Sequence, residues 1–391
     1  MTRERRSSDR HSPPQAGGTQ NATRSGGLSP GAPIPAGLHV PGPTPLHPEV
    51  AAAMAQPLIS YRGPEARALL GRIAQGFSDF LGTERQPVLL TASGTGAMEA
   101  TLANLLSPGD PVLGIGGGQF AERFLGVAEA FALETRSLDT PWGRAVAPER
   151  LRVALRTGPE TRAVLLTHSE TSTGVLHPLP ELVRVVREES DALVLVDAVS
   201  SLGGMPLAVD SCDAVFTASQ KAWGLPPGMA MVWTSERAAA AERSARLPRY
   251  YWSFSRYRDA LARGSMPFTP AVPVLFAMEA GLRLMLREGR DAVFRRHAEA
   301  AAAARGRLQA MGLRLVADEE SATNTVTAAW LPPGVAWPEL TRTLQERHGV
   351  VLAGGLGQLQ GKILRLGHLG WTTARDVHRA ADALETCLRA A

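Results

Sequence analysis

Residues 214–233 read AVFTASQKAWGLPPGMAMVW, and this stretch decides the fold. Two apolar runs, Ala214–Thr217 and Met229–Trp233, enclose a polar loop that carries Lys221. Each run has the length of a strand that is buried on both faces. Strands of this kind are typical of a sheet covered by helices on both sides. The stretch therefore predicts two strands of an α/β domain, with Lys221 just beyond a strand end.

Upstream of this stretch the chain alternates apolar runs with helical segments. Helices are predicted between many of the strands, for instance at Met98–Leu106 and Leu179–Glu188. This alternation indicates a mainly parallel sheet flanked by helices. Four more strands are expected, at Val88–Thr91, Val112–Ile115, Ala163–Thr167 and Ala192–Val196.

The pattern changes after two long predicted helices, Phe276–Arg287 and Ala292–Met311. Strands and helices then indicate a smaller α+β domain, with strands at Leu313–Val316, Thr325–Ala329, Val350–Leu352 and Ile363–Leu366 and helices at Trp337–Arg347 and Asp376–Arg389. We therefore expect four regions: a disordered tail at 1–37, a segment at 38–60 that lines the site and joins the small domain, a large domain at 61–288, and a small C-terminal domain at 289–391.

The composition narrows the function classes. Hydrophobic residues make up 44% of the 391 residues and charged residues 20%, as in an ordinary globular protein. The net charge is +4, and residues 1–37 alone carry five Arg against one Glu and one Asp, or +3. The rest of the chain is therefore nearly neutral, and we expect no nucleic-acid partner. No apolar run approaches the roughly 18 residues of a membrane helix, so we expect no membrane span. Two cysteines give no disulfide framework, and we predict a cytoplasmic protein without a metal site.

Lys221 is a candidate for chemistry because the chain uses arginine almost everywhere else. Only two of its 41 basic residues are lysines, Lys221 and Lys362. A guanidinium stays protonated in proteins, whereas a lysine amine can lose its proton and form a Schiff base. Chance retention of two lysines is the alternative.

Four polar clusters follow predicted strands, where open parallel sheets bind ligands. Ser93, Gly94 and Thr95 precede a helix whose free N–H groups suit a phosphate, although a plain helix cap would look the same. Asp197 ends an apolar strand, and its carboxylate needs either a cation, such as a protonated pyridine nitrogen, or a turn to cap.

The other two clusters are 167–174 and 364–368. The first reads THSETSTG and suggests a binding loop, and its spacing does not match a zinc-binding helix. In the second, Arg365 lies between apolar residues and could pair with a substrate carboxylate or with an internal acid.

Six motifs in this order resemble the class V aminotransferases, which are pyridoxal 5'-phosphate (PLP) enzymes of fold type I. They are PGPTP (41–45), SGTGAMEA (93–100), HSETSTG (168–174), VDAVSSLGG (196–204), SQKAWGLPPG (219–228) and LRLGHLG (364–370). The resemblance covers about residues 38–391 and is closest to the alanine/serine–glyoxylate, or serine–pyruvate, aminotransferases.

The resemblance implies a role for each site residue. Lys221 matches the lysine that forms the Schiff base with PLP, and Asp197 matches the partner of the pyridine nitrogen. Arg365 matches the arginine that binds the substrate carboxylate, and Gly42 lies in the substrate-facing loop. The remaining cofactor contacts are Phe120 and Val199 on the two ring faces, Thr171 near the ring oxygen, Ser93, Gly94, Thr95 and Gln220 on the phosphate, and Thr269 reaching the phosphate of the neighbouring subunit.

The resemblance further implies a homodimer with shared active sites that moves an amino group from serine or alanine to glyoxylate or pyruvate by a ping-pong mechanism. A ureidoglycine–glyoxylate aminotransferase, a lyase- or desulfurase-like reaction, and a catalytically silent PLP-fold protein are the alternatives. Three positions depart from the family pattern: Met266 replaces a hydroxyl-bearing residue, Tyr61 replaces a common histidine, and Trp223 is unusually bulky.

Overall fold

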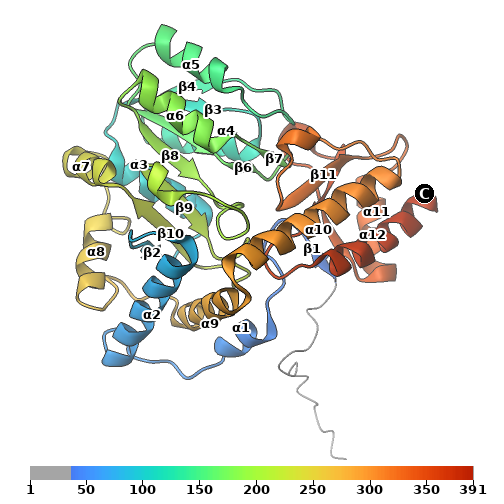
Figure 1. Ribbon diagram of the computed structural model, residues 1–391, viewed down its shortest axis with the longest axis horizontal. Coiled ribbons are helices and arrows are strands. Elements are labelled where there is room, and N and C mark those ends of the chain that lie inside the picture. The colour runs from blue at the N-terminus through green and yellow to red at the C-terminus, as the bar shows by residue number, and fades with distance from the viewer. Residues whose placement is uncertain (1–36, 391) are drawn as a thin grey trace, which may run out of the picture.

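The computed structural model describes residues 37–390, which form a large part and a smaller C-terminal part (Figure 1). A seven-stranded sheet in the order β2-β10-β9-β8-β5-β3-β4 forms the centre of the large part. All neighbouring strands are parallel except β10, which is antiparallel to β2 and β9. The sheet is therefore mainly parallel, as predicted. Its strands are β2 (Val88–Leu90), β3 (Pro111–Ile115), β4 (Glu134–Leu138), β5 (Ala163–Thr167), β8 (Leu193–Asp197), β9 (Ala214–Ala218) and β10 (Ala230–Thr234).

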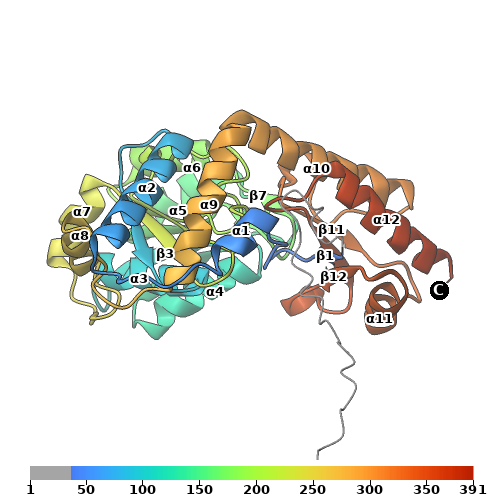
Figure 2. The same ribbon diagram turned by 90° about the horizontal axis from the view of Figure 1, so that it is seen from below.

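Helices cover both faces of this sheet (Figures 1 and 2). The first face carries α3 (Gly94–Leu105) and α4 (Gln119–Ala130). The opposite face carries α2 (Pro64–Leu81), α5 (Pro148–Thr157), α6 (Leu179–Glu189) and α9 (Val272–Glu288). The remaining elements of the large part are α1 (Pro48–Ala53), α7 (Glu236–Ser244), α8 (Phe254–Ala262), the short strands β6 (Ser169–Glu170) and β7 (Val175–Leu176), and the 3-10 helix η1 (Val209–Ser211).

The core of the large part lies between the sheet and these helices. Strands β5, β8 and β9 are buried over their whole length, which explains their uninterrupted apolar sequences. On the side of α2, the ring of Phe77 packs edge-on against Trp223 and Trp233, with centroids 5.0 and 5.4 Å apart. Such aromatic pairs add about 0.5–1.5 kcal/mol beyond the area that they bury.

The C-terminal part is built on a four-stranded sheet with the order β1-β12-β13-β11. Strand β1, near the start of the described chain, pairs in parallel with β12, so the N-terminal segment completes the C-terminal sheet. A second apolar core lies between this sheet and its helices. The elements are β1 (Leu38–His39), α10 (Arg290–Ala310), η2 (Glu319–Ser321), β11 (Val326–Trp330), α11 (Trp337–His348), β12 (Val351–Gly354), η3 (Gly357–Leu359), β13 (Ile363–Gly367) and α12 (Ala374–Arg389).

One predicted strand is wrong. Residues 313–316 form no strand, because the chain turns at Gly312, where φ is +78°, and then meets β11 through a single bridge at Leu315. The other predicted strands and helices are present, with ends that differ by a few residues. The predicted tail lies outside the described residues except for Gly37, and the three boundaries between the four regions stay predictions.

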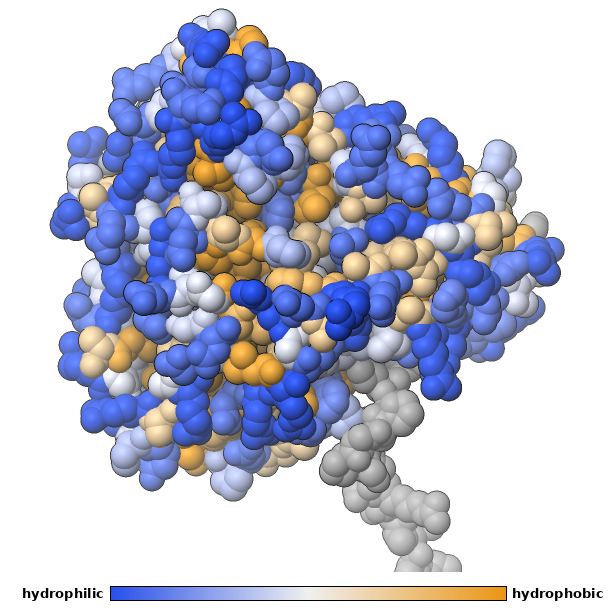
Figure 3. Space-filling view, viewed as in Figure 1, coloured by the Kyte–Doolittle hydropathy of each residue, from blue (hydrophilic) through white to orange (hydrophobic). Residues whose placement is uncertain are grey.

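The surface and the helices of the described chain are those of an ordinary globule. Figure 3 shows a mainly hydrophilic face, with apolar residues gathered toward the middle of the large part. Within residues 37–390, no helix combines the length and the apolar character needed to cross a membrane.

Candidate active site

A hollow of about 230 Å³ lies at the carboxyl ends of β8 and β9, beside the first turns of α3 and α4. Ten of the twelve predicted site residues line it: Gly42, Ser93, Gly94, Thr95, Phe120, Thr171, Asp197, Val199, Gln220 and Lys221. The topology explains this convergence, because strands β2, β5, β8 and β9 all present their carboxyl ends at the same edge of the sheet.

One end of the hollow is suited to an anion. Ser93 is the N-cap of α3, and its hydroxyl accepts the N–H of Gly96 at 3.4 Å. The next N–H groups of the helix and its positive dipole end therefore face the hollow. Gln220 also lines the hollow, and its side-chain oxygen is buried without a hydrogen-bond partner. Only the NH₂ group of this amide could donate to an anion.

Lys221 is buried and exposes only 9% of its surface. Its Nζ donates a hydrogen bond to the carbonyl oxygen of Pro41. Burial lowers the pKa of Lys221 to about 8, and the neighbouring Arg365 adds to this effect. Gly42, with φ +106°, lets the chain pass close by, because a Cβ there would lie 2.7 Å from Cδ of Lys221. The amine is thus partly neutral near physiological pH, as a nucleophile or base must be.

Asp197 lies at the end of β8 and is 4% exposed. Its Oδ1 accepts the N–H of Val199 at 2.9 Å. Burial raises the pKa of Asp197 to about 7, although the hydrogen bond from Val199 opposes the rise. A buried carboxylate of this kind is stabilised by a cationic N–H donor in the hollow.

Phe120, on the first turn of α4, and Val199, two residues after Asp197, both line the hollow. The Nζ of Lys221 is 5.8 Å from the centroid of the Phe120 ring. Gly94 is needed beside Val199, because a Cβ at Gly94 would lie 2.7 Å from Cγ2 of Val199. The hollow therefore offers one aromatic and one aliphatic side chain to a bound ring.

Arg365, on β13 of the C-terminal part, reaches the edge of the hollow. Its Nε donates to the carbonyl of Gly354 at 2.8 Å and one terminal nitrogen to the carbonyl of Thr171 at 3.1 Å. Burial lowers the pKa of Arg365 to about 10, so the side chain stays a cation at neutral pH. Among residues 37–390, no carboxylate forms an ion pair with Arg365, which leaves donors for a substrate carboxylate.

Two polar residues near the hollow were missed from the sequence. Glu170 is fully buried and accepts the N–H groups of Phe120 and Ala121, both at 3.1 Å, so it caps α4 and fixes the Phe120 backbone. Arg123 lies one turn further along α4 and also lines the hollow. A Glu inside the motif HSETSTG was visible, but its helix partner becomes apparent only in the fold.

Two predicted residues do not line the hollow, Arg365 and Thr269. Thr269 is exposed, so its predicted contact, which involves a second subunit, stays a prediction. The three departures also lie outside the hollow. Trp223 is fully buried against Phe77, and Met266 and Tyr61 line a small apolar cavity near α2.

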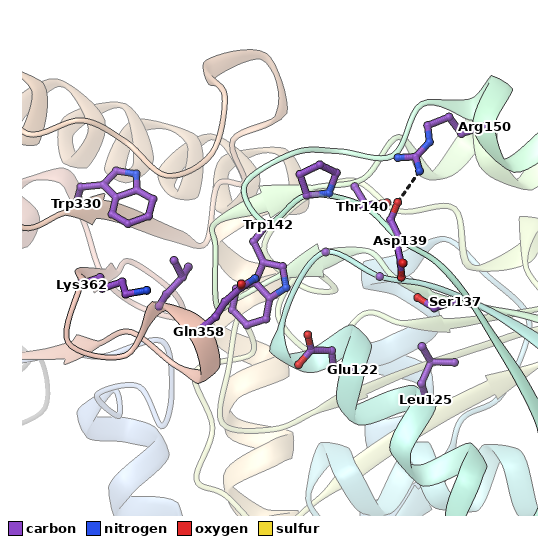
Figure 4. Close-up of a pocket in the computed structure, with 14 residues that line it drawn as sticks. Glu122, Leu125, Ser137, Asp139, Thr140, Trp142, Arg150, Trp330, Gln358 and Lys362 are labelled. Atoms are coloured by element: carbon purple, nitrogen blue, oxygen red, sulfur yellow. Dashed lines mark hydrogen bonds between the residues drawn. The ribbon is translucent and has the colours of Figure 1, made fainter.

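A second and larger hollow, of about 820 Å³, opens between the two parts of the molecule (Figure 4). Trp142, Glu122 and Arg150 approach it from the large part, and Trp330 and Lys362 approach it from the C-terminal part. Lys362 is exposed there, unlike the buried Lys221. Only the smaller hollow combines a buried lysine with a buried carboxylate.

The donor set of the smaller hollow fits PLP. The helix end and the NH₂ group of Gln220 match a phosphate, and Phe120 and Val199 offer contacts to a pyridine ring. Asp197 matches a ring N–H, and Lys221 matches the aldehyde carbon. In contrast, no group of three or more His, Cys, Asp and Glu among residues 37–390 could hold a metal ion.

Known proteins are similar to this chain over most of its length. The family model for aminotransferase class V matches residues 42–366. The chain is 38% identical to the 42 kDa subunit of a soluble hydrogenase from Anabaena cylindrica, over 90% of this chain and 92% of that protein. It is 35% identical to an L-aspartate–glyoxylate aminotransferase from Paracoccus denitrificans, over 86% and 87%. Among solved structures, an alanine–glyoxylate aminotransferase from Nostoc sp. superposes with a TM-score of 0.87 at 32% identity, over 91% of this chain and 96% of that one.

Proposed function

Because the chain belongs to the class V aminotransferases and is therefore a PLP-dependent transaminase, we propose that it moves the amino group of serine or alanine to glyoxylate or pyruvate. The observation that carries this proposal is that Lys221 and Asp197 line one hollow, and that Arg365 donates to the carbonyl of the lining residue Thr171. These three side chains provide the amine, the buried carboxylate and the carboxylate-binding cation that a transamination needs.

Most of the lining residues would hold the cofactor. Lys221 would bind it covalently, and Asp197 would accept a hydrogen bond from its ring nitrogen. Phe120 and Val199 would enclose the ring, and Thr171 would lie near the ring oxygen. The phosphate would be bound by Ser93, Gly94, Thr95 and Gln220.

The protein side chains then prepare and move a proton. When bound, PLP supplies an electron sink for the charge left when Cα loses its proton. The buried Asp197 carboxylate would stabilise a positive charge on the ring nitrogen of the cofactor. Nζ of Lys221, with its pKa near 8, takes the proton from Cα and returns it later in the cycle. Arg365 binds the substrate carboxylate and so fixes the orientation of Cα, and the first keto acid leaves before the second binds, which predicts ping-pong kinetics.

The choice of substrates rests on the site and on the relatives. The hollow is small, and Arg365 offers one cation for one carboxylate, which favours a small amino acid. The names of the Paracoccus and Nostoc relatives share the acceptor glyoxylate and differ in the donor. Glyoxylate is therefore the acceptor that we favour.

A desulfurase reaction is not supported by the cysteines. Cys212 and Cys387 are both buried, and burial raises the pKa of Cys212 to about 11. A nucleophilic cysteine needs a lowered pKa and access to substrate. The same buried, unpaired thiols agree with a cytoplasmic location, which stays a prediction.

We also propose a homodimer in which Thr269 of one subunit contacts the cofactor phosphate of the other. Thr269 is exposed, and Tyr250 and Tyr251, whose rings pack against the preceding Phe268, expose 66% and 38% of their surfaces. Exposed aromatic residues are typical of interfaces.

Refolding a Lys221→Ala chain together with a Thr269→Ala chain should give mixed dimers with one fully competent site. Tight PLP binding recovered in the mixture supports the shared site, and a monomer on a sizing column contradicts it.

The proposed reaction is tested by the visible absorption of the purified holoenzyme during titration with serine, alanine, glycine, aspartate and ureidoglycine. Serine or alanine should convert the bound cofactor to its amino form, and glyoxylate or pyruvate should restore the original spectrum. Conversion by ureidoglycine alone would identify the alternative aminotransferase. If the wild-type protein binds no PLP, the proposed cofactor is wrong for this chain.

A further inference from the structure

Arg123 lies at the mouth of the cofactor hollow, on the first turns of α4. One terminal nitrogen of its guanidinium is 3.3 Å from the Thr95 hydroxyl oxygen, and the guanidinium carbon is 4.8 Å from the centroid of the Phe120 ring. Both neighbours belong to the hollow, and Arg123 lines it as well. The side chain thus links the anion-binding end of the hollow to its aromatic wall.

Arg123 is the fifth residue of α4 and contacts Thr95, the second residue of α3, so its guanidinium lies beside the positive N-terminal end of α3. Asp197 lines the same hollow but forms no ion pair with Arg123. Lys221 adds a further amine in the same hollow. Within residues 37–390, none of the ion pairs includes Arg123. Its sequence neighbour Glu122 faces the other hollow (Figure 4).

A cation that lies beside a helix N-terminus and forms no ion pair among residues 37–390 indicates an anionic ligand that the two share. The Arg123–Thr95 contact places the guanidinium at the end of the hollow where α3 presents its free N–H groups. An arginine donates two hydrogen bonds to a phosphate and adds a full positive charge, which neither the helix end nor Gln220 supplies.

We propose that Arg123 is a ligand of the cofactor phosphate and supplies the charge that the uncharged contacts Ser93, Gly94, Thr95 and Gln220 lack. This inference rests on the proposed function, because it needs PLP in the hollow. The competing explanation is that Arg123 only holds the Phe120 ring by a cation–π contact. The two explanations differ in whether the effect of Arg123 depends on the phosphate.

A thermodynamic cycle separates the two explanations. The dissociation constants of PLP and of pyridoxal, which lacks the phosphate, are measured for the full-length apoprotein and for Arg123→Gln by quenching of tryptophan fluorescence. A charged hydrogen bond contributes enough to raise the dissociation constant of PLP about tenfold or more in Arg123→Gln. Pyridoxal should bind both proteins equally, and Arg123→Lys should recover part of the PLP affinity.

Arg150→Gln is the matched control, because it removes the same charge from an exposed arginine of the second hollow. It should leave both constants unchanged. Equal weakening of PLP and pyridoxal in Arg123→Gln would assign Arg123 to the Phe120 ring and overturn the inference, as would unchanged PLP binding. Failure of the wild type to bind PLP would instead overturn the proposed function.

Discussion

Replacing the buried carboxylate of Asp197 by an amide should stabilise the apoprotein at pH 8. Burial raises the pKa of Asp197 from 3.8 to about 7 in the folded protein. At about 1.4 kcal/mol for each pH unit, keeping the folded carboxylate ionised costs about 4 kcal/mol of folding free energy at pH 8. An amide avoids this cost, but its NH₂ group stays unpaired in the hollow, which costs about 1–3 kcal/mol. We therefore expect Asp197→Asn to raise the free energy of unfolding by about 1–3 kcal/mol at pH 8.

The sign of the pH dependence follows from the raised pKa. The contribution of Asp197 to the free energy of unfolding is most favourable below the unfolded pKa of 3.8, where the carboxyl group is protonated in both states. This contribution is lost as pH rises through the folded pKa of about 7. The advantage of Asp197→Asn should therefore shrink as pH falls from 8 to 4. Urea unfolding of the two apoproteins at several pH values measures it, with Asp259→Asn as the control for an exposed carboxylate. An advantage that is absent at pH 8, or that does not change with pH, would refute the reasoning.

Three further predictions concern ligand binding. Arg365→Ala should raise KM for both the amino donor and the keto acceptor about tenfold or more, because both carboxylates lose the same charged donor; steady-state kinetics with unchanged KM for both would contradict this role. Gly42→Ala should weaken PLP binding by about 1–3 kcal/mol, because its Cβ would meet Lys221, whereas Gly361→Ala, also at positive φ but with open space around it, should not. The rate of PLP capture by the apoprotein should rise with pH and level off above about pH 8, as the Lys221 amine becomes neutral; a stopped-flow profile that is flat between pH 6 and 9 would be evidence against this amine as the nucleophile.

Buried strands and chemically unusual residues could be predicted from the sequence. Strands such as β5 can be recognised by an uninterrupted apolar sequence, because every residue is buried. Asp197 and Arg365 stand out because a charge inside an apolar run needs a partner. Strand β4 was missed, since its sequence ETRSL belongs to an exposed edge and has no apolar run.

Other residues owe their significance to contacts that the chain order does not contain. Glu170 caps α4 across about 50 positions of sequence, and Arg123 meets Thr95 across 28. In the sequence alone, Arg123 resembles an ordinary surface charge, and Glu170 lies in a predicted binding loop with no sign of its contact with α4. The expected strand at 313–316 failed for a related reason, because its apolar residues pack as a loop against β11.

The short segment 38–44 has two structural roles, one in the C-terminal sheet and one beside Lys221. Leu38 and His39 form an edge of the C-terminal sheet, and two residues later the carbonyl of Pro41 accepts a hydrogen bond from the Lys221 amine. Thr44 is then fixed by its N–H, which donates to the carbonyl of Gln220 at 3.2 Å. Because so few residues lie between these contacts, an insertion or deletion in the segment would displace at least one of them. Changes in its length should therefore be far rarer among functional variants of this chain than changes in the identity of its side chains.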